Sequence, residues 1–197
     1  IAEAGVVEQD AEREYLEITE KIVYKDPDSG SEIIALPDTD YNLNVMISFN
    51  SSVLNNQFAV LENLDDFKSQ VAPCRTFVFV RELEFLLKND LVKGGDLDNA
   101  IVIMDKEISQ DELNRLADLF NHEHIEVKKE QGILNNLDLQ FENECARHKL
   151  LDVVGDLSLA GRRIKGRIIA TKPGHKANTE FAKLLKKEIR KLRWDQM

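Results

Sequence analysis

Hydrophobic and polar residues alternate with a period of two along much of the first third of the chain. The longest such run, residues 41–50, places Leu43, Val45 and Ile47 on one side of a strand. A turn at residues 26–30, DPDSG, separates two further runs. Strands are therefore predicted at residues 15–24, 31–36, 41–50 and 58–62. We expect them to pair as antiparallel, hairpin-linked strands in a sheet with one buried face.

The later part of the chain shows helical periodicity. Apolar residues recur every three or four positions in 144–157 and again in 178–193, where Lys and Arg fill the last turns and oppose the helix dipole. A shorter helix is predicted at 64–71, with Asn63 as its N-cap. An alternating strand, residues 164–171, separates the two long helices. This pattern predicts an α+β fold, a two-layer sandwich in which a sheet packs on two main helices.

The helix at 144–157 places three chemically useful side chains on one face. His148, Asp152 and Asp156 follow one another at intervals of four residues, and such positions stack on one side of a helix. An imidazole and a carboxylate at this spacing can reach one divalent metal, with both donor atoms about 2.0 Å from zinc. The same spacing is common in solvated ion pairs, and a catalytic zinc usually takes three protein ligands. The segment TKPGH at 171–175 favours the metal site, because it delivers another His where a strand turns into a helix.

Three separated stretches agree in order and spacing with one known family. They are CRTFVFVRELEFLLKNDLVKGGDLDNAIVI at 74–103, RHKLLDVVGDL at 147–157 and KPGH at 172–175. They resemble the zinc-dependent UDP-3-O-acyl-N-acetylglucosamine deacetylases, which catalyse the committed step of lipid A synthesis. The resemblance implies hydrolysis of the N-acetyl amide of UDP-3-O-(3-hydroxyacyl)-N-acetylglucosamine, with one Zn²⁺ in each full-length active site. Because this family builds its α+β layers twice, the chain resembles the second copy.

The resemblance also assigns catalytic roles to residues of this chain. His148 and Asp152 match two metal ligands. His175 matches the second acid/base residue, held as an imidazolium, and Asp156 matches its carboxylate partner. The family's third ligand, a His, and its general base, a Glu, belong to the N-terminal half, and neither motif is in this chain. We therefore expect the chain alone to be catalytically incomplete.

Three more polar residues receive roles from the resemblance. Thr76 matches a hydroxyl that helps to hold the oxyanion. Lys149 corresponds to a cation on the oxyanion side, and Lys172 to one that meets the UDP diphosphate. Without the resemblance, Thr76 is simply a polar residue after a helix, and both lysines are ordinary surface charges.

Residues 78–104 resemble a small β-α-β insert that forms a hydrophobic passage for the substrate's acyl chain. The predicted lining consists of Phe77 at the mouth and of Leu83, Val92, Ala100 and Val102 along the walls. The sequence supports an apolar surface there, since a helical pattern is followed by the continuous apolar strand 100–104. A compact core without a cavity would produce the same periodicity.

Residues 105–135 depart from the family pattern and are predicted to be an extra helical insertion. A capping-box signature at 109–112, SQDE, opens its helix. His122 and His124 lie in this segment and look like half of a metal site. We do not assign them as ligands, because alternate His near a helix end are commonly solvated.

Composition and charge narrow the function classes. With 197 residues, 43% of them hydrophobic, the chain is long enough for a genuine core. The net charge of −10 argues against a nucleic-acid partner. Cys74 and Cys145 are the two cysteines, which favours a reducing, cytoplasmic location over a disulfide scaffold. No apolar run approaches the roughly 18 residues that a transmembrane segment needs.

The pattern predicts three parts. Residues 1–14 form the tail of an N-terminal domain and a linker, 15–194 form the second deacetylase domain, and 195–197 begin another linker. The partners implied are the UDP-sugar substrate, the N-terminal half of the same enzyme and, in one branch of Gram-negative bacteria, a fused 3-hydroxyacyl-carrier-protein dehydratase. The alternative is a non-catalytic interaction domain that keeps the deacetylase fold and uses 105–135 as its contact surface.

Overall fold

The alternating segments of the sequence form one large sheet. The computed structural model describes residues 3–83, 99–105, 109–119, 127–128, 132–134 and 138–194. The sheet has six strands: β1 (Tyr15–Glu17), β2 (Ile22–Asp26), β3 (Ser31–Leu36), β4 (Tyr41–Ile47), β5 (Gln57–Leu61) and β10 (Arg163–Thr171). Their order is β2-β3-β10-β4-β5, and β1 pairs with β10. Burial alternates residue by residue along β3 and β10, as the period-two pattern predicts.

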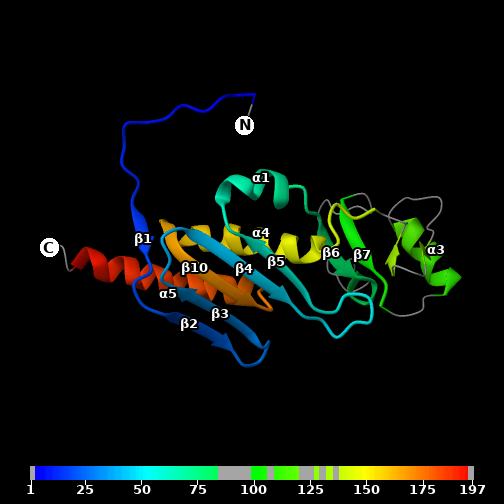
Figure 1. Ribbon diagram of the computed structural model, residues 1–197. Helices are drawn as coiled ribbons and strands as arrows, with labels where there is room; N and C mark the ends of the chain where they lie inside the picture. Colours follow the sequence, from blue (N-terminus) through cyan, green and yellow to red (C-terminus); the bar gives the residue numbers. More distant parts are fainter. Residues whose placement is uncertain are drawn as a thin grey trace.

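Two long helices cover one face of this sheet (Figure 1). Helix α4 (Glu144–Leu157) packs against β4 and β5, whereas α5 (His175–Trp194) packs against β2 and β3. Both layers contribute fully buried side chains to the core, among them Leu43, Ile168, Leu150 and Phe181. Burying one such side chain is worth about 1.5–3 kcal/mol. The predicted α+β sandwich is therefore confirmed.

The prediction of hairpin-linked antiparallel neighbours is wrong for the centre of the sheet. β10 lies between β3 and β4, antiparallel to β3 and parallel to β4. β1 is also parallel to β10. Alternation along a strand specifies which side chains are buried but not which strand lies beside it. β10, the strand that follows α4, therefore occupies the central position of the sheet. Its carboxyl end leads to His175, which lies next to α4.

A small second sheet extends from one end of the molecule (Figure 1). Its order is β6-β7-β9-β8, with β6 at Thr76–Phe79, β7 at Ala100–Ile103, β8 at Val127–Lys128 and β9 at Ile133–Leu134. β6 and β7 are parallel. Parallel strands need a crossover connection, and the predicted β-α-β insert contains one. The 3₁₀ turn η1 (Leu64–Asp66) and the short α1 (Phe67–Gln70) precede β6, and α3 (Gln110–Leu119) follows β7. Asn63 caps η1 as predicted, because its side chain accepts a hydrogen bond from the Asp65 N–H.

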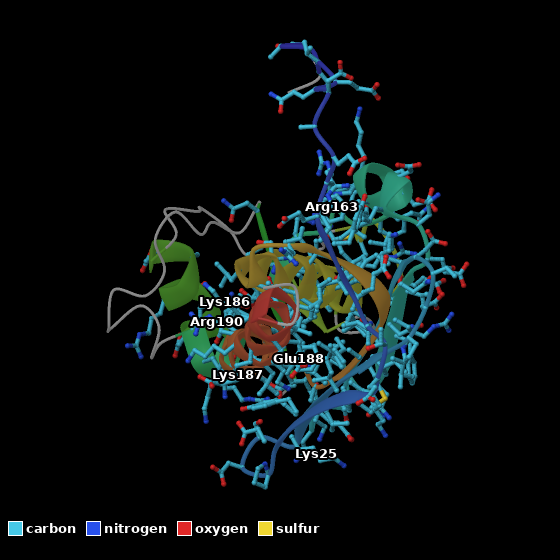
Figure 2. All side chains as sticks on the ribbon, turned by 90° about the vertical axis from the view of Figure 1, so that its left-hand side faces the viewer. Lys25, Arg163, Lys186, Lys187, Glu188 and Arg190 are labelled. Atoms are coloured by element: carbon cyan, nitrogen blue, oxygen red, sulfur yellow. The ribbon has the colours of Figure 1, made fainter. Side chains whose placement is uncertain are left out.

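Helix α5 begins three residues earlier than its apolar pattern indicates. The pattern predicts a start at Asn178, but His175 is already the first helical residue, and Asn178 N–H donates to the Gly174 carbonyl at 2.9 Å. Farther along, Lys186, Lys187 and Arg190 lie on the exposed side of α5 (Figure 2). A short 3₁₀ turn, η2 (Ser158–Ala160), connects α4 to β10.

Some predictions fall outside the described residues. Val92, His122, His124 and residues 195–197 are among them. The predicted ranges of the insert and of the insertion stay predictions. No helix in the described part of the chain is long and apolar enough to cross a membrane.

Candidate active site

His148 and Asp152 converge on adjacent turns of α4. Nδ1 of His148 lies 3.3 Å from the Cys74 carbonyl oxygen, and its Nε2 lies 3.5 Å from Oδ1 of Asp152. A carbonyl only accepts hydrogen bonds, so this contact favours the tautomer with the proton on Nδ1. The Nε2 lone pair then faces a carboxylate oxygen, and a cation shared by both atoms would satisfy them. The pair is thus suited to hold two coordination positions of one metal ion.

These two donors are not joined by a third within the described part of the chain. No group of three or more His, Cys, Asp or Glu side chains in the described ranges is arranged to hold a metal ion. The donor set fits zinc in kind, since imidazole nitrogen and carboxylate oxygen are both common zinc ligands. The pair alone offers two of the three protein ligands that a catalytic zinc usually takes.

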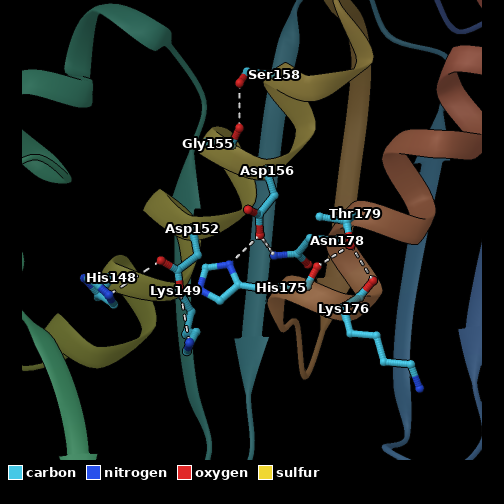
Figure 3. A network of polar contacts seen from close by, with 10 residues as sticks. All are labelled: His148, Lys149, Asp152, Gly155, Asp156, Ser158, His175, Lys176, Asn178 and Thr179. Carbon is cyan, nitrogen blue, oxygen red and sulfur yellow. Dashed lines mark hydrogen bonds and ion pairs between the residues drawn. The ribbon is translucent and has the colours of Figure 1, made fainter. Parts of the chain in front are cut away.

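A second polar pair joins the end of α4 to the start of α5 (Figure 3). Nδ1 of His175 lies 2.9 Å from Oδ2 of Asp156. The Asp156 side chain is 17% exposed and that of His175 is 70% exposed. The carboxylate therefore holds the ring from its inner side and leaves Nε2 towards solvent. As in other carboxylate–imidazole pairs, this contact fixes the tautomer and the direction of the ring.

Asn178 also contacts the Asp156 carboxylate, although no sequence motif pointed to this residue. It is fully buried, and its Nδ2 donates to Oδ2 of Asp156 at 2.8 Å. Its position three residues after His175 is the available signal, because both side chains then lie on one face of the helix. Asp156 thus accepts two hydrogen bonds on one oxygen, which restricts its rotation.

Lys149 and Phe77 lie next to the His148–Asp152 pair. Nζ of Lys149 is 2.9 Å from Oδ2 of Asp152 and 5.6 Å from the centroid of the Phe77 ring. Thr76 begins β6 two residues after Cys74, and its side chain is exposed. The structure therefore brings the small sheet next to the turn of α4 that carries His148 and Asp152.

Lys172 occupies a fixed turn between β10 and His175. Its backbone is left-handed, with φ of 48°, a conformation that costs roughly 1 kcal/mol or more for a residue other than glycine. Two backbone contacts hold it: its N–H donates to the Met46 carbonyl at 2.7 Å, and its carbonyl accepts from the Ser31 hydroxyl at 2.6 Å. The exposed side chain is left free to meet a ligand.

The predicted passage residues divide between the two faces of the small sheet. Register pairs Thr76 with Ala100 and Phe77 with Ile101, and paired residues share a face. Thr76, Ala100 and Val102 therefore share one face, whereas Phe77 lies on the other and packs against Phe49 at 5.6 Å between ring centroids. Leu83 is buried. Ile101, Ile103 and Ile133 are among the residues that line a cavity of about 590 Å³. Ile101 and Ile103 lie on the face of the small sheet opposite Ala100 and Val102.

Both cysteines are buried thiols. Burial, together with the negative charge of Glu144, raises the pKa of Cys74 to about 11 and that of Cys145 to about 12. A protonated thiol is a poor metal ligand and a poor nucleophile. Cys145 is therefore a core residue, buried among the side chains of the sheet and helices.

Comparison with known proteins decides the family. A family model described as the UDP-3-O-acyl N-acetylglycosamine deacetylase LpxC matches residues 1–126 and 114–187. The chain belongs to this family. The bifunctional enzyme LpxC/FabZ of Bacteroides thetaiotaomicron is 51% identical over 190 residues, which cover 96% of this chain and 41% of that protein. The bifunctional enzyme of Porphyromonas gingivalis is 52% identical, also with 96% of this chain and 41% of that protein covered.

Other relatives are named as deacetylases alone, without the second, FabZ activity. The UDP-3-O-acyl-N-acetylglucosamine deacetylase of Syntrophotalea carbinolica is 35% identical, with 92% of this chain and 50% of that protein covered. The resemblance inferred from three stretches is therefore confirmed. This family member spans about half the length of such relatives, or less, and its site residues come from that portion.

Proposed function

We propose that this chain is the second half of a zinc-dependent deacetylase that hydrolyses the N-acetyl amide of UDP-3-O-(3-hydroxyacyl)-N-acetylglucosamine in lipid A biosynthesis. One observation supports this most strongly. The His148–Asp152 pair and the Asp156–His175 pair follow one another along a single side of α4, so that a metal-ligand pair lies beside an acid/base pair. Amide hydrolysis with a metal needs both.

His148 and Asp152 would hold the zinc ion through Nε2 and a carboxylate oxygen. Zinc in such a site supplies a water of lowered pKa and polarises a carbonyl group. The third protein ligand and the general base come, in this proposal, from the N-terminal half of the enzyme. The Nδ1–H group of His148 donates to the Cys74 carbonyl oxygen at 3.3 Å. This contact orients the ring and strengthens Nε2 as a metal ligand.

His175 acts as the general acid. Oδ2 of Asp156 accepts a hydrogen bond from the Nδ1–H group at 2.9 Å and stabilises the imidazolium form, which leaves the Nε2–H to reach the substrate. The general base of the N-terminal half takes a proton from the water, and the water oxygen bonds to the acetyl carbon. The carbon–nitrogen bond then breaks, and Nε2 of His175 delivers its proton to the leaving amine. The products are acetate and the free amine. A positioned acid of this kind contributes roughly 10² to 10⁴ in rate.

Thr76 and Lys149 serve the oxyanion. The Thr76 hydroxyl donates to the developing negative charge, and Lys149, fixed by Asp152 at 2.9 Å, adds a positive charge beside it. Lys172 reaches the UDP diphosphate from its fixed turn. Phe77, on one face of the small sheet, and Ala100 and Val102, on the other face, contact different parts of the acyl chain. Leu83 and Val92 are the other residues that we propose for this contact.

The cellular partners follow from the relatives. The two relatives that are 51% and 52% identical are named as bifunctional LpxC/FabZ enzymes, which supports a fusion of this deacetylase to a 3-hydroxyacyl-carrier-protein dehydratase. Free, buried thiols are compatible with a cytoplasmic location, which we also propose.

The chain alone is expected to fold, to bind zinc weakly and to lack deacetylase activity. The folding part rests on its own two-layer core, and the weak binding on having two ligands instead of three. The test is a zinc titration of this chain, repeated after the N-terminal half is added in trans, with hydrolysis assayed in both mixtures. Tight binding and turnover by the chain alone would refute the proposal. A mixture that folds and binds zinc but never deacetylates would favour the non-catalytic domain.

Replacing Asn178 by Ala in the full-length enzyme should lower kcat roughly 10- to 100-fold, the usual effect of losing an outer hydrogen bond at such a site. Asp156 would keep His175 but lose the donor that restricts its own rotation. Zinc content should stay at the wild-type level, because neither metal ligand contacts Asn178. Steady-state kinetics and metal analysis measure the two effects, and a kcat equal to that of the wild type would show that Asn178 only fills the core.

A further inference from the structure

Arg75 and Glu144 form a buried ion pair beside the metal-ligand turn of α4. The Glu144 side chain is 0% exposed and that of Arg75 is 17% exposed. The carboxylate accepts hydrogen bonds from the Arg75 Nε and Nη2 atoms, both at 2.9 Å. It also accepts from the backbone N–H of Arg75 at 2.9 Å and of Gln140 at 2.6 Å. Four donors therefore occupy this carboxylate.

Glu144 precedes His148 by four residues and so continues the row of Asp156, Asp152 and His148 along α4. From the sequence it could be taken for a third metal ligand. The structure excludes that role, because the hydrogen bonds from Arg75 and Gln140 use the acceptor positions of both oxygens. The carboxylate must instead act through what it holds.

What it holds is the peptide unit between Cys74 and Arg75. The N–H of this unit, on Arg75, donates to Glu144 at 2.9 Å, and its carbonyl, on Cys74, faces Nδ1 of His148 at 3.3 Å. A trans peptide is planar, with its N–H and C=O pointing in opposite directions. One rigid group is thus fixed between two side chains that lie one helical turn apart. It cannot rotate without losing both contacts.

We propose that Glu144 and Arg75 are positioning residues for His148 and Thr76, a role that rests on the proposed deacetylase function. Glu144 fixes the peptide that orients the His148 ring, and Arg75 locks Glu144 in place with its fork of two N–H groups. The same anchor fixes the start of β6, where Thr76 directly follows Arg75. The two chemical groups that come from different segments, the metal ligand and the oxyanion donor, thereby share one support.

The charges of the pair depend on each other. Burial raises the pKa of Glu144, but the hydrogen bonds from Arg75 and the Gln140 N–H, together with the positive charge of Arg75, outweigh it, so that the pKa of this carboxyl is lowered. Removing one partner leaves the other charge buried and unpaired, which is strongly destabilising, whereas replacing both by apolar side chains is often neutral. The double replacement therefore separates stability from positioning.

The test uses the full-length enzyme with Glu144→Gln, Arg75→Lys and the double variant Arg75→Met, Glu144→Leu. We expect each to weaken zinc binding roughly 10- to 100-fold, to lower kcat more than it changes KM, and to alter the d–d absorption of the cobalt-substituted protein. The double variant should melt near the wild-type temperature and still bind zinc weakly, because its 75 N–H has lost the carboxylate. A double variant with wild-type zinc affinity and cobalt spectrum would overturn the proposal.

A control variant separates positioning from loss of stability. Ile189→Ala removes a buried core side chain fourteen residues beyond His175 along α5, and it should lower the melting temperature without changing zinc affinity at 25 °C. Equal weakening of zinc binding in this control would also overturn the proposal. Failure of the proposed function is recognised separately: the wild-type enzyme would then bind zinc but not deacetylate, while the zinc and cobalt measurements on the variants would still decide the role of Glu144.

Discussion

Alanine in place of His148 or Asp152 is expected to abolish stoichiometric zinc in the full-length enzyme and, with it, deacetylase activity. In the proposed site each substitution removes one of three protein ligands, and a two-ligand site competes poorly with water and buffer for the ion. The two donors lie 3.5 Å apart on adjacent turns, and no other group in the described ranges is arranged to replace either one. Metal analysis after dialysis, followed by a deacetylation assay, measures both losses.

Glu188→Ala is the matched control for these two variants. It also removes a charged residue from a helix, but one whose partner is Lys191 on the outer part of α5, at 2.7 Å. Surface pairs of this kind are worth at most about 1 kcal/mol, so zinc content and activity should equal those of the wild type. Stoichiometric zinc in both His148→Ala and Asp152→Ala would disprove the assignment of the ligands.

Replacing His175 by Ala should leave bound zinc intact and slow turnover roughly 10² to 10⁴-fold. That loss corresponds to about 3–5 kcal/mol of transition-state stabilisation. The hydrogen-bond partner of the ring is Asp156, at 2.9 Å, and not one of the two proposed metal ligands. The zinc content should therefore equal that of the wild type. Zinc analysis and kcat measured on the same preparation separate the two effects.

Thr179→Ala tests whether any slowing comes from the helix start instead of the imidazole. Its hydroxyl donates to the His175 carbonyl at 2.7 Å, so its loss perturbs the same first turn of α5 and leaves the ring in place. We expect near wild-type turnover for this variant. Unchanged turnover in His175→Ala, or an equal loss in Thr179→Ala, would mean that His175 is only a residue of the first helical turn.

Periodicity alone was sufficient to predict the layers of this protein. The spacing of apolar residues predicts strands with alternating burial and two amphipathic helices, and it also predicts which side of each element is buried. Spacing was also sufficient for the row of His148, Asp152 and Asp156, because residues four apart in a helix share a face whatever surrounds it.

Contacts between distant segments could not be predicted in this way. The central place of β10, parallel to β4, depends on long-range packing, which leaves no local period. His148 was therefore predicted as a candidate ligand, but not the carbonyl that orients it. Asp156 was predicted as a partner of His175, but not the second donor to its carboxylate, Asn178.

The amino-acid sequence by itself determined the family, the α+β class and the side chains available for chemistry. The tertiary structure decided how they are held: Glu144 is a ligand type at ligand spacing, yet Arg75, distant in the sequence, engages its carboxylate through three N–H groups. The physical reason is that helical spacing fixes only the direction of a side chain relative to its own helix. Whether a carboxylate binds a metal or a guanidinium depends on which group the rest of the fold places in front of it.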